Sequence, residues 1–274
     1  MKFSMKKVSL GVCTLALAAL VPLSAQAHRQ WLLPSATVLS GNDPWVTVDA
    51  AVSNDLFNFE HFPMRLEGLA VTGPDGKFIK AENAATGRYR SVFDVHLTQE
   101  GTYKIAVINR GLTAMYKVGS ETKRWRGSPE AFAKEVPANA QDLQVTESLS
   151  RVESFVTRGK PTTAALATTG DGLELAPITH PNDLVDGSTA SFRLLHDGKP
   201  AANVKVEVVP GGIRYRDKLN DIHVTTDADG KFSVKWPAPG MYWLEADVRD
   251  DKVSIKPAKA RRAAYAVTLE VLPQ

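Results

Sequence analysis

Short runs of alternating apolar and polar residues fill most of the chain and predict β-strands. Residues 45–52 (WVTVDAAV) alternate and are rich in β-branched side chains, and the same pattern recurs at 65–71, 89–97 and 102–108. Turn-forming clusters such as SGNDP at 40–44 separate these runs. One short helix is predicted where Ser128 can cap a segment that has Pro129 at its first position.

A Thr-, Ala- and Gly-rich stretch at 161–172 divides this pattern into two halves. Further strands are predicted beyond it at 190–195, 204–209, 222–226, 231–236, 240–248 and 265–272. Short strands separated by regular turns are typical of β-sandwiches. We therefore predict an all-β fold of two Ig-like sandwich domains, residues 28–160 and 173–274, joined by a linker at 161–172. Trp236 and Trp243 lie in strong strand patterns and are expected to fill the second core.

The first 27 residues are predicted to form a cleaved secretion signal. Three lysines precede an apolar run at 8–23, and Ala25-Gln26-Ala27 is a small-x-small cleavage site. The apolar run is too short for a comfortable membrane span. Cleavage would make His28 the first residue of the mature protein and would place that protein in the periplasm.

Removal of the signal changes the charge of the protein. The full chain has 33 basic and 30 acidic residues, and the signal takes away three lysines, which leaves 30 of each. This balance implies no nucleic-acid or membrane-surface partner. The only cysteine, Cys13, is also removed, so the mature chain has neither disulfides nor a cysteine nucleophile. The sequence also contains no Gly-x-Ser-x-Gly motif and no P-loop, which favours a protein that is not an enzyme.

His28 at a free amino terminus offers a metal two nitrogens, the α-amine and one imidazole nitrogen. The α-amine has an ordinary pKa of about 7.7–8.0 and imidazole of about 6.5, so a metal can displace both protons near neutral pH. A second imidazole would complete a nitrogen-rich set that suits Cu(II) or Ni(II). The alternative interpretation of His28 is a solvated terminal histidine.

The best further ligand is His61, which lies in the polar and aromatic loop at 53–65. This loop follows the strand at 45–52, which we expect to pair near the amino-terminal segment. Glu60 and Asp55 are predicted to be further ligands, or acceptors that fix the imidazole. The alternative is a packed loop in which His61 is a hydrogen-bonded structural residue. The remaining histidines are expected on a solvated face, in turns or in a strand: His96, His180, His196 and His223.

Two resemblances to known families add to these patterns. DGKPAANVKV at 197–206, TTDADGKF at 225–232 and PGMYWL at 239–244 resemble the carboxypeptidase-regulatory, transthyretin-like β-sandwich. The whole mature chain, from HRQWLLPS at 28–35 through LELAP at 173–177, resembles the exported DUF4198 family. That resemblance implies two β-domains and a link to metal handling, because members are related in name to periplasmic components of nickel or cobalt uptake systems.

Three functions are compatible with the sequence. The first is a periplasmic transition-metal-binding protein, an accessory to metal uptake or delivery whose partner is an inner- or outer-membrane metal transporter. The second is a structural or adhesive module that binds no metal stoichiometrically. The third is an enzyme that resembles copper-dependent polysaccharide monooxygenases, which would consume peroxide in an ascorbate-driven reaction.

Overall fold

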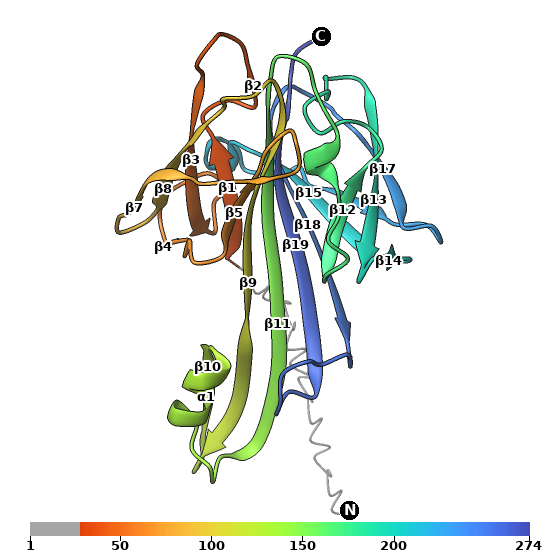
Figure 1. Ribbon diagram of the computed structural model, residues 1–274. Coiled ribbons are helices and arrows are strands. Elements are labelled where there is room, and N and C mark those ends of the chain that lie inside the picture. The colour runs from red at the N-terminus through yellow and green to blue at the C-terminus, as the bar shows by residue number, and fades with distance from the viewer. Residues whose placement is uncertain (1–27) are drawn as a thin grey trace, which may run out of the picture.

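Three β-sheets form the described part of the computed structural model, residues 28–274 (Figure 1). The predicted all-β sandwich fold is confirmed. The predicted signal peptide, residues 1–27, lies outside the described residues. No helix within residues 28–274 is long and apolar enough to cross a membrane.

The first sheet has the order β1-β3-β8-β7, with β4 paired to β3 as well. Alternation is clear in β8, where Phe93 and Val95 are buried and His96 on the opposite face is half-buried. The sheet consists of β1 (Arg29–Pro34), β3 (Trp45–Ser53), β4 (Phe62–Pro63), β7 (Glu82–Thr86) and β8 (Ser91–His96).

The second sheet has ten strands in the order β16-β15-β18-β19-β11-β9-β5-β6, with β10 paired to β9 and β2 to β11. It joins strands from both halves of the sequence, because β11 pairs with β19 in parallel. The strands are β2 (Val38–Leu39), β5 (Leu69–Thr72), β6 (Phe78–Ile79), β9 (Gly101–Val118), β10 (Glu121–Gly127), β11 (Gln141–Arg158), β15 (Lys205–Pro210), β16 (Ile222–Thr225), β18 (Gly240–Asp250) and β19 (Ala260–Val271).

The third sheet has the order β12-β13-β14, with β17 also paired to β13. Three short helices complete the described residues, and each lies in a connection between strands. These elements are β12 (Leu173–Pro177), β13 (Thr189–His196), β14 (Lys199–Pro200), β17 (Lys231–Lys235), α1 (Pro129–Glu135), η1 (Ala164–Leu166) and η2 (Ile213–Tyr215).

Opposite faces of the second sheet build two separate cores. On β18, Trp243 packs in the core beneath the first sheet, whereas Tyr242 and Leu244 pack in the core beneath the third. On β19, Ala266 packs in the core beneath the first sheet and Tyr265 packs in the core beneath the third. Successive residues of a strand point to opposite faces, so the second sheet is the middle of three layers. Both sandwiches therefore share this sheet.

The shared sheet corrects one prediction about the cores. Trp236 is fully buried in the core of the third sheet, as expected. Trp243 is equally buried but belongs to the core of the first sheet, so its predicted place was wrong. The physical reason is that β18 is covered on both faces, and alternation alone does not say which face meets which partner.

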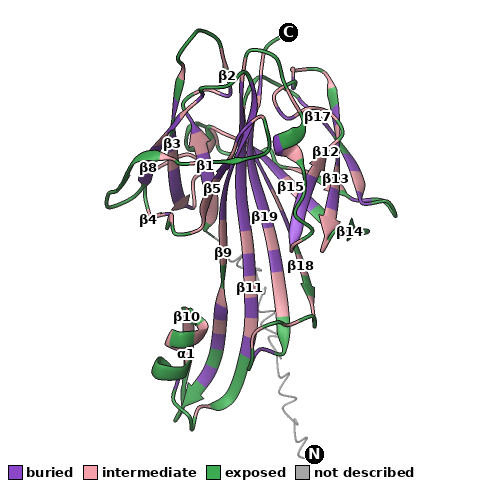
Figure 2. Cartoon of the chain, in the orientation of Figure 1, coloured by how far each residue is buried: buried purple, intermediate pink, exposed green. Residues whose placement is uncertain are grey.

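The middle sheet continues beyond the sandwiches as a long ribbon (Figure 1). Both β9 and β11 are 18 residues long and pair over most of that length. The segment at 119–143 folds back as β10 and as the predicted short helix, α1. The predicted cap is confirmed, since Ser128 Oγ accepts the Ala131 N–H at 3.2 Å and Pro129 begins the helix. Figure 2 shows buried residues between the sheets and exposed ones at the far end of the ribbon.

The segment at 161–172 lies against the second sheet and is hydrogen-bonded to it. Lys104 Nζ donates to the carbonyl of Ala167 at 2.7 Å, and the Thr102 N–H donates to Thr162 Oγ1 at 3.0 Å. Backbone amides of Thr169 and Gly170 donate to the buried Glu174 carboxylate. The division of the chain into two domains at this segment stays a prediction.

Candidate metal centre

Strand register brings His28 beside the loop that carries His61. β1 pairs with β3 so that Arg29 lies opposite Ser53, and β4 pairs with the same end of β3 through Phe62 opposite Val52. His28 directly precedes β1, and His61 directly precedes β4. Both histidines therefore lie at the end of β3, one on each side of it.

The two imidazole rings are in contact. Their centroids are 4.0 Å apart and their planes are inclined by 89°, an edge-to-face arrangement. The Phe62 ring lies 6.2 Å from the ring of His28 and 5.4 Å from that of His61. His28 is exposed and His61 is half-buried, so the pair is open to solvent on one side.

Asn54 links both histidines through its side-chain amide. Its Oδ1 lies 2.8 Å from His28 Nδ1, and its Nδ2 lies 3.4 Å from His61 Nε2. An amide oxygen only accepts and an amide nitrogen only donates, so this pairing puts a proton on His28 Nδ1 and a lone pair on His61 Nε2. No sequence signal distinguished Asn54 from the other polar residues of this loop.

Glu60 fixes the loop by accepting hydrogen bonds from two of its backbone amides. Its Oε1 accepts the backbone N–H of Asn54 at 2.8 Å and that of Asp55 at 2.9 Å. The Asp55 carbonyl accepts from Ser53 Oγ at 2.6 Å. These bonds hold the backbone that positions the Asn54 amide, which is the supporting role proposed for residues around a metal ligand.

Neither Glu60 nor Asp55 completes a set of three ligands with the two histidines. Within residues 28–274, the one group whose three ligand atoms lie within 4.8 Å of one another is elsewhere in the fold. The structure thus brings His28 and His61 together and places Glu60 and Asp55 in the adjoining loop. Direct coordination by either carboxylate stays a prediction.

Aromatic packing anchors the same loop to the core. Trp31 of β1 contacts Phe57 and Phe59 of the loop, with ring centroids 5.5 and 5.6 Å apart. The Trp31 indole N–H donates to Ser53 Oγ at 2.8 Å, and Trp31 is fully buried. This packing explains the presence of Phe57 and Phe59 in the loop. His28, Phe59, Glu60 and Phe62 are exposed to solvent, and His61 is half-buried.

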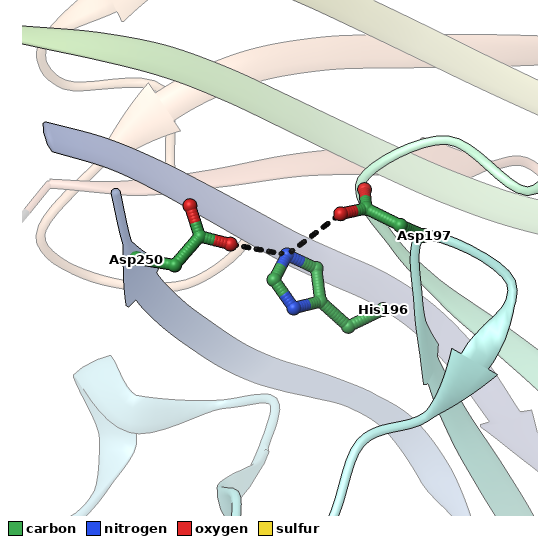
Figure 3. A group of neighbouring side chains, drawn as sticks. All are labelled: His196, Asp197 and Asp250. Atoms are coloured by element: carbon green, nitrogen blue, oxygen red, sulfur yellow. Dashed lines mark ion pairs between the residues drawn. The ribbon is translucent and has the colours of Figure 1, made fainter. Parts of the chain in front are cut away.

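The other group of ligand-type side chains is His196, Asp197 and Asp250 (Figure 3). His196 Nε2 lies 3.4 Å from a carboxylate oxygen of Asp250 and 3.8 Å from one of Asp197. All three residues are half-buried and connect the turn after β13 to the end of β18. By residue type alone, this group could hold a divalent cation.

Arg261 already occupies the centre of that group. Its guanidinium donates to Asp197 and to Asp250 at 2.6 Å each, and its Nη2 lies 3.0 Å from His196 Nε2. Hydrogen bonds from the Arg261 guanidinium lower the pKa of the Asp250 carboxyl. Burial by itself would raise the pKa of the Asp197 carboxyl, but the hydrogen bonds and charge of Arg261 outweigh it, so this pKa is lowered as well. A metal would have to displace a paired arginine, so we assign this group a structural role.

The remaining histidines have partners in the fold. His96 stacks on Trp45 with ring centroids 4.1 Å apart and pairs with Asp43. His223 pairs with Asp221 beside β16. His180 is hydrogen-bonded to Thr102 Oγ1 at 3.0 Å. The charged loop around η2 is organised by Arg216, whose guanidinium donates to several backbone carbonyls.

Comparison with known proteins gives a family but no activity. The family described as "Domain of unknown function (DUF4198)" matches residues 25–250. No curated protein matches the chain. The D0-D1 domain of intimin is 12% identical, with 88% of this chain and 97% of that chain covered and a TM-score of 0.23. Dimeric latent PorU from Porphyromonas gingivalis is 14% identical, with 90% of this chain and 20% of that chain covered and a TM-score of 0.23. TM-scores this low carry no argument about this chain.

Proposed function

The chain belongs to the DUF4198 family, and we propose that it is an exported protein that binds a transition metal, copper or nickel, through the amino terminus of its mature form. The observation that supports this proposal is the contact between the His28 and His61 rings, whose centroids lie 4.0 Å apart. Two imidazoles in contact next to a predicted cleavage site would become a three-nitrogen set once the α-amine of His28 is free.

The chemistry of these donors fits the proposed metals. The α-amine and imidazole of His28 belong to one residue and can chelate together, and His61 adds the third nitrogen. Chelation through His28 Nδ1 would exchange its hydrogen bond with Asn54 Oδ1 for the metal. Glu60 would keep its supporting role, because it holds the backbone of Asn54 rather than either imidazole.

The cellular role follows from export and from the resemblance to metal-uptake components. In this role the protein resides in the periplasm and captures or delivers a metal ion for an inner- or outer-membrane transporter. Exposure of His28 supports transfer, because a ligand at the surface can be reached by a partner protein.

Isothermal titration of the mature, metal-free protein with Cu(II) and with Ni(II) tests the proposal. We expect one metal per chain when His28 is the authentic first residue. One glycine added before His28 should weaken binding more than His61→Ala, because it destroys the chelate whereas His61→Ala leaves it intact. Binding should weaken as the pH falls through about 6.5, where protons compete for imidazole.

Three histidine variants serve as matched controls. His96→Ala, His223→Ala and His196→Ala each remove one imidazole outside the candidate centre and should leave the affinity unchanged. Loss of binding in His196→Ala, with normal binding after amino-terminal extension, would move the metal to the group around Asp250. Absence of stoichiometric binding by the mature protein would favour the structural or adhesive module.

A further inference from the structure

A groove of about 680 Å³ runs along the middle sheet and reaches His28 at one end. Its floor is made by short side chains of β11 and β19, which leave space above the sheet. The floor residues are Thr146, Ser148, Ser150, Ala264 and Ala266.

Besides the buried Arg151, four arginines line this groove: Arg124 and Arg126 of β10, Arg249 of β18 and Arg262 of β19. Arg249 follows Trp243 by six residues on one strand, so both project from the same face of the sheet. Arg262 is the register partner of Arg249, and partners across a ladder share a face. Strand pairing therefore gathers arginines that are far apart in the sequence.

Strand order puts these arginines on opposite sides of the floor. From β19 to β10 the order is β19, β11, β9 and β10, which is three interstrand spacings, or about 14 Å across a flat sheet. Long arginine side chains can reach over such a floor from both sides. Small side chains between them keep the space open for a ligand.

Most of these guanidinium groups lack a protein partner. Arg262 pairs with Asp247 at 2.7 Å. The guanidinium groups of Arg124, Arg126 and Arg249 form no hydrogen bond or ion pair with any residue of the part of the chain that the structure describes. Among those same residues, Glu245 is the one carboxylate that lines the groove. The mature chain is balanced in charge overall, so this concentration of arginine is local.

A second hollow of about 500 Å³ extends the basic surface. It shares Gln30, Arg126 and Ser148 with the groove and adds Arg65, Glu67 and Arg110 to the lining, and Arg110 is paired with Asp171. Like charges that face one concave space repel one another, and a bound anion relieves that repulsion. Solvated arginines spread over a convex face would need no such compensation.

We propose that this groove binds a small molecule that carries two or more oxyanionic groups, carboxylates or phosphates. The guanidinium fork matches both kinds of group, since it donates two parallel hydrogen bonds to a pair of oxygens. The volume lies within the range of about 300–1,000 Å³ found for small-molecule sites. This inference stands apart from the metal centre, because the anion is bound by arginines and not by His28.

Isothermal titration of the mature, metal-free protein with citrate and with pyrophosphate tests the inference, with acetate as a singly charged comparison. Citrate and pyrophosphate distinguish a carboxylate ligand from a phosphate ligand. The variant R124Q/R126Q should weaken binding of the preferred anion at least about tenfold, because two charge-assisted hydrogen-bond donors are lost. Glu245→Gln removes the negative charge from the lining and should strengthen binding.

A matched control is the variant R88Q/R214Q, which removes the same charge from exposed positions outside the groove. It should change the affinity less than about twofold, and circular dichroism should show both double variants folded. The inference is overturned if neither citrate nor pyrophosphate binds, if acetate binds as tightly as either, or if the two double variants lose the same affinity.

Discussion

The indole N–H of Trp243 donates to the carbonyl of Gln30 at 2.9 Å, although the two residues are 213 positions apart. Trp243 lies on β18 in the middle sheet, and Gln30 lies on β1, two residues after His28. The guanidinium of Arg29 also stacks 5.4 Å from the Trp243 ring. The second half of the chain thus fixes the strand that begins at the candidate metal centre.

Trp243→Phe should lower the free energy of unfolding by about 1–3 kcal/mol, because it leaves the Gln30 carbonyl without its donor. Denaturant unfolding monitored by circular dichroism measures this change. Trp125→Phe is the control, since Trp125 packs on α1 at the far end of the ribbon. Equal stability of Trp243→Phe and the wild type would show that the bond does not secure β1.

A buried charged group beneath the third sheet gives a second prediction. The Arg151 guanidinium lies 3.4 Å from Glu153 and 3.4 Å from Glu174, and all three side chains are buried. Burial and the adjacent Glu153 carboxylate raise the pKa of Tyr265 well above its ordinary value, so its hydroxyl stays protonated and donates to Glu153 at 2.8 Å.

Arg151→Met should therefore cost about 3–5 kcal/mol of stability, because it leaves two buried carboxylates without their cation. Arg110→Met breaks an exposed pair with Asp171 and should cost only about 0–1 kcal/mol. Urea unfolding of both variants provides the comparison. A cost for Arg151→Met as small as that of Arg110→Met would mean that the carboxylates become neutral or hydrated at little expense.

The half-buried His180 predicts a pH dependence of stability. Burial lowers the pKa of His180, while the Thr162 carbonyl and Asp183 oppose this shift only in part. The Asn182 N–H donates to His180 Nδ1 at 3.1 Å, so protonation at that atom breaks a native hydrogen bond. The folded-state pKa of His180 is below the unfolded value of about 6.5. The free energy of unfolding should therefore be unaffected by His180 above pH ~6.5 and should decrease as the pH falls below that value.

The matched measurement is denaturant unfolding of the wild type and of His180→Gln between about pH 7 and pH 5. Carboxyl groups with lowered pKa, such as Asp250, lose their contribution only at more acidic pH, near or below about 4. Over this pH range, the free energy of unfolding should decrease less in His180→Gln than in the wild type. The same slope in both proteins would assign the decline to other groups.

Alternation along the strands predicted much of the fold. In β8 it correctly put Phe93 and Val95 in the core and His96 on the other face. For Trp243 it was insufficient, because a strand covered on both faces offers two cores and the pattern does not choose between them. The sharing of one sheet by both sandwiches depends on the parallel pairing of β11 with β19, which no local signal encodes.

The candidate centre was partly visible in the sequence. His28 follows the cleavage motif and His61 lies in an unusual loop, so both could be singled out by position. Asn54 could not, because its role depends on the register that places it between the two rings. The arginine groove could not be predicted from the sequence either. Arg126 and Arg249 have the sequence pattern of ordinary exposed residues, and only strand pairing places them on one face of the sheet.

Electron paramagnetic resonance of the mature protein with one equivalent of Cu(II) tests the central claim most directly. The signal should show hyperfine coupling to three nitrogens, from the His28 amine, the His28 imidazole and the His61 imidazole. His61→Ala should remove one nitrogen, and one glycine added before His28 should abolish the chelate spectrum. A spectrum that is unchanged by the added glycine would contradict the account, because the metal would then be bound without the amino terminus.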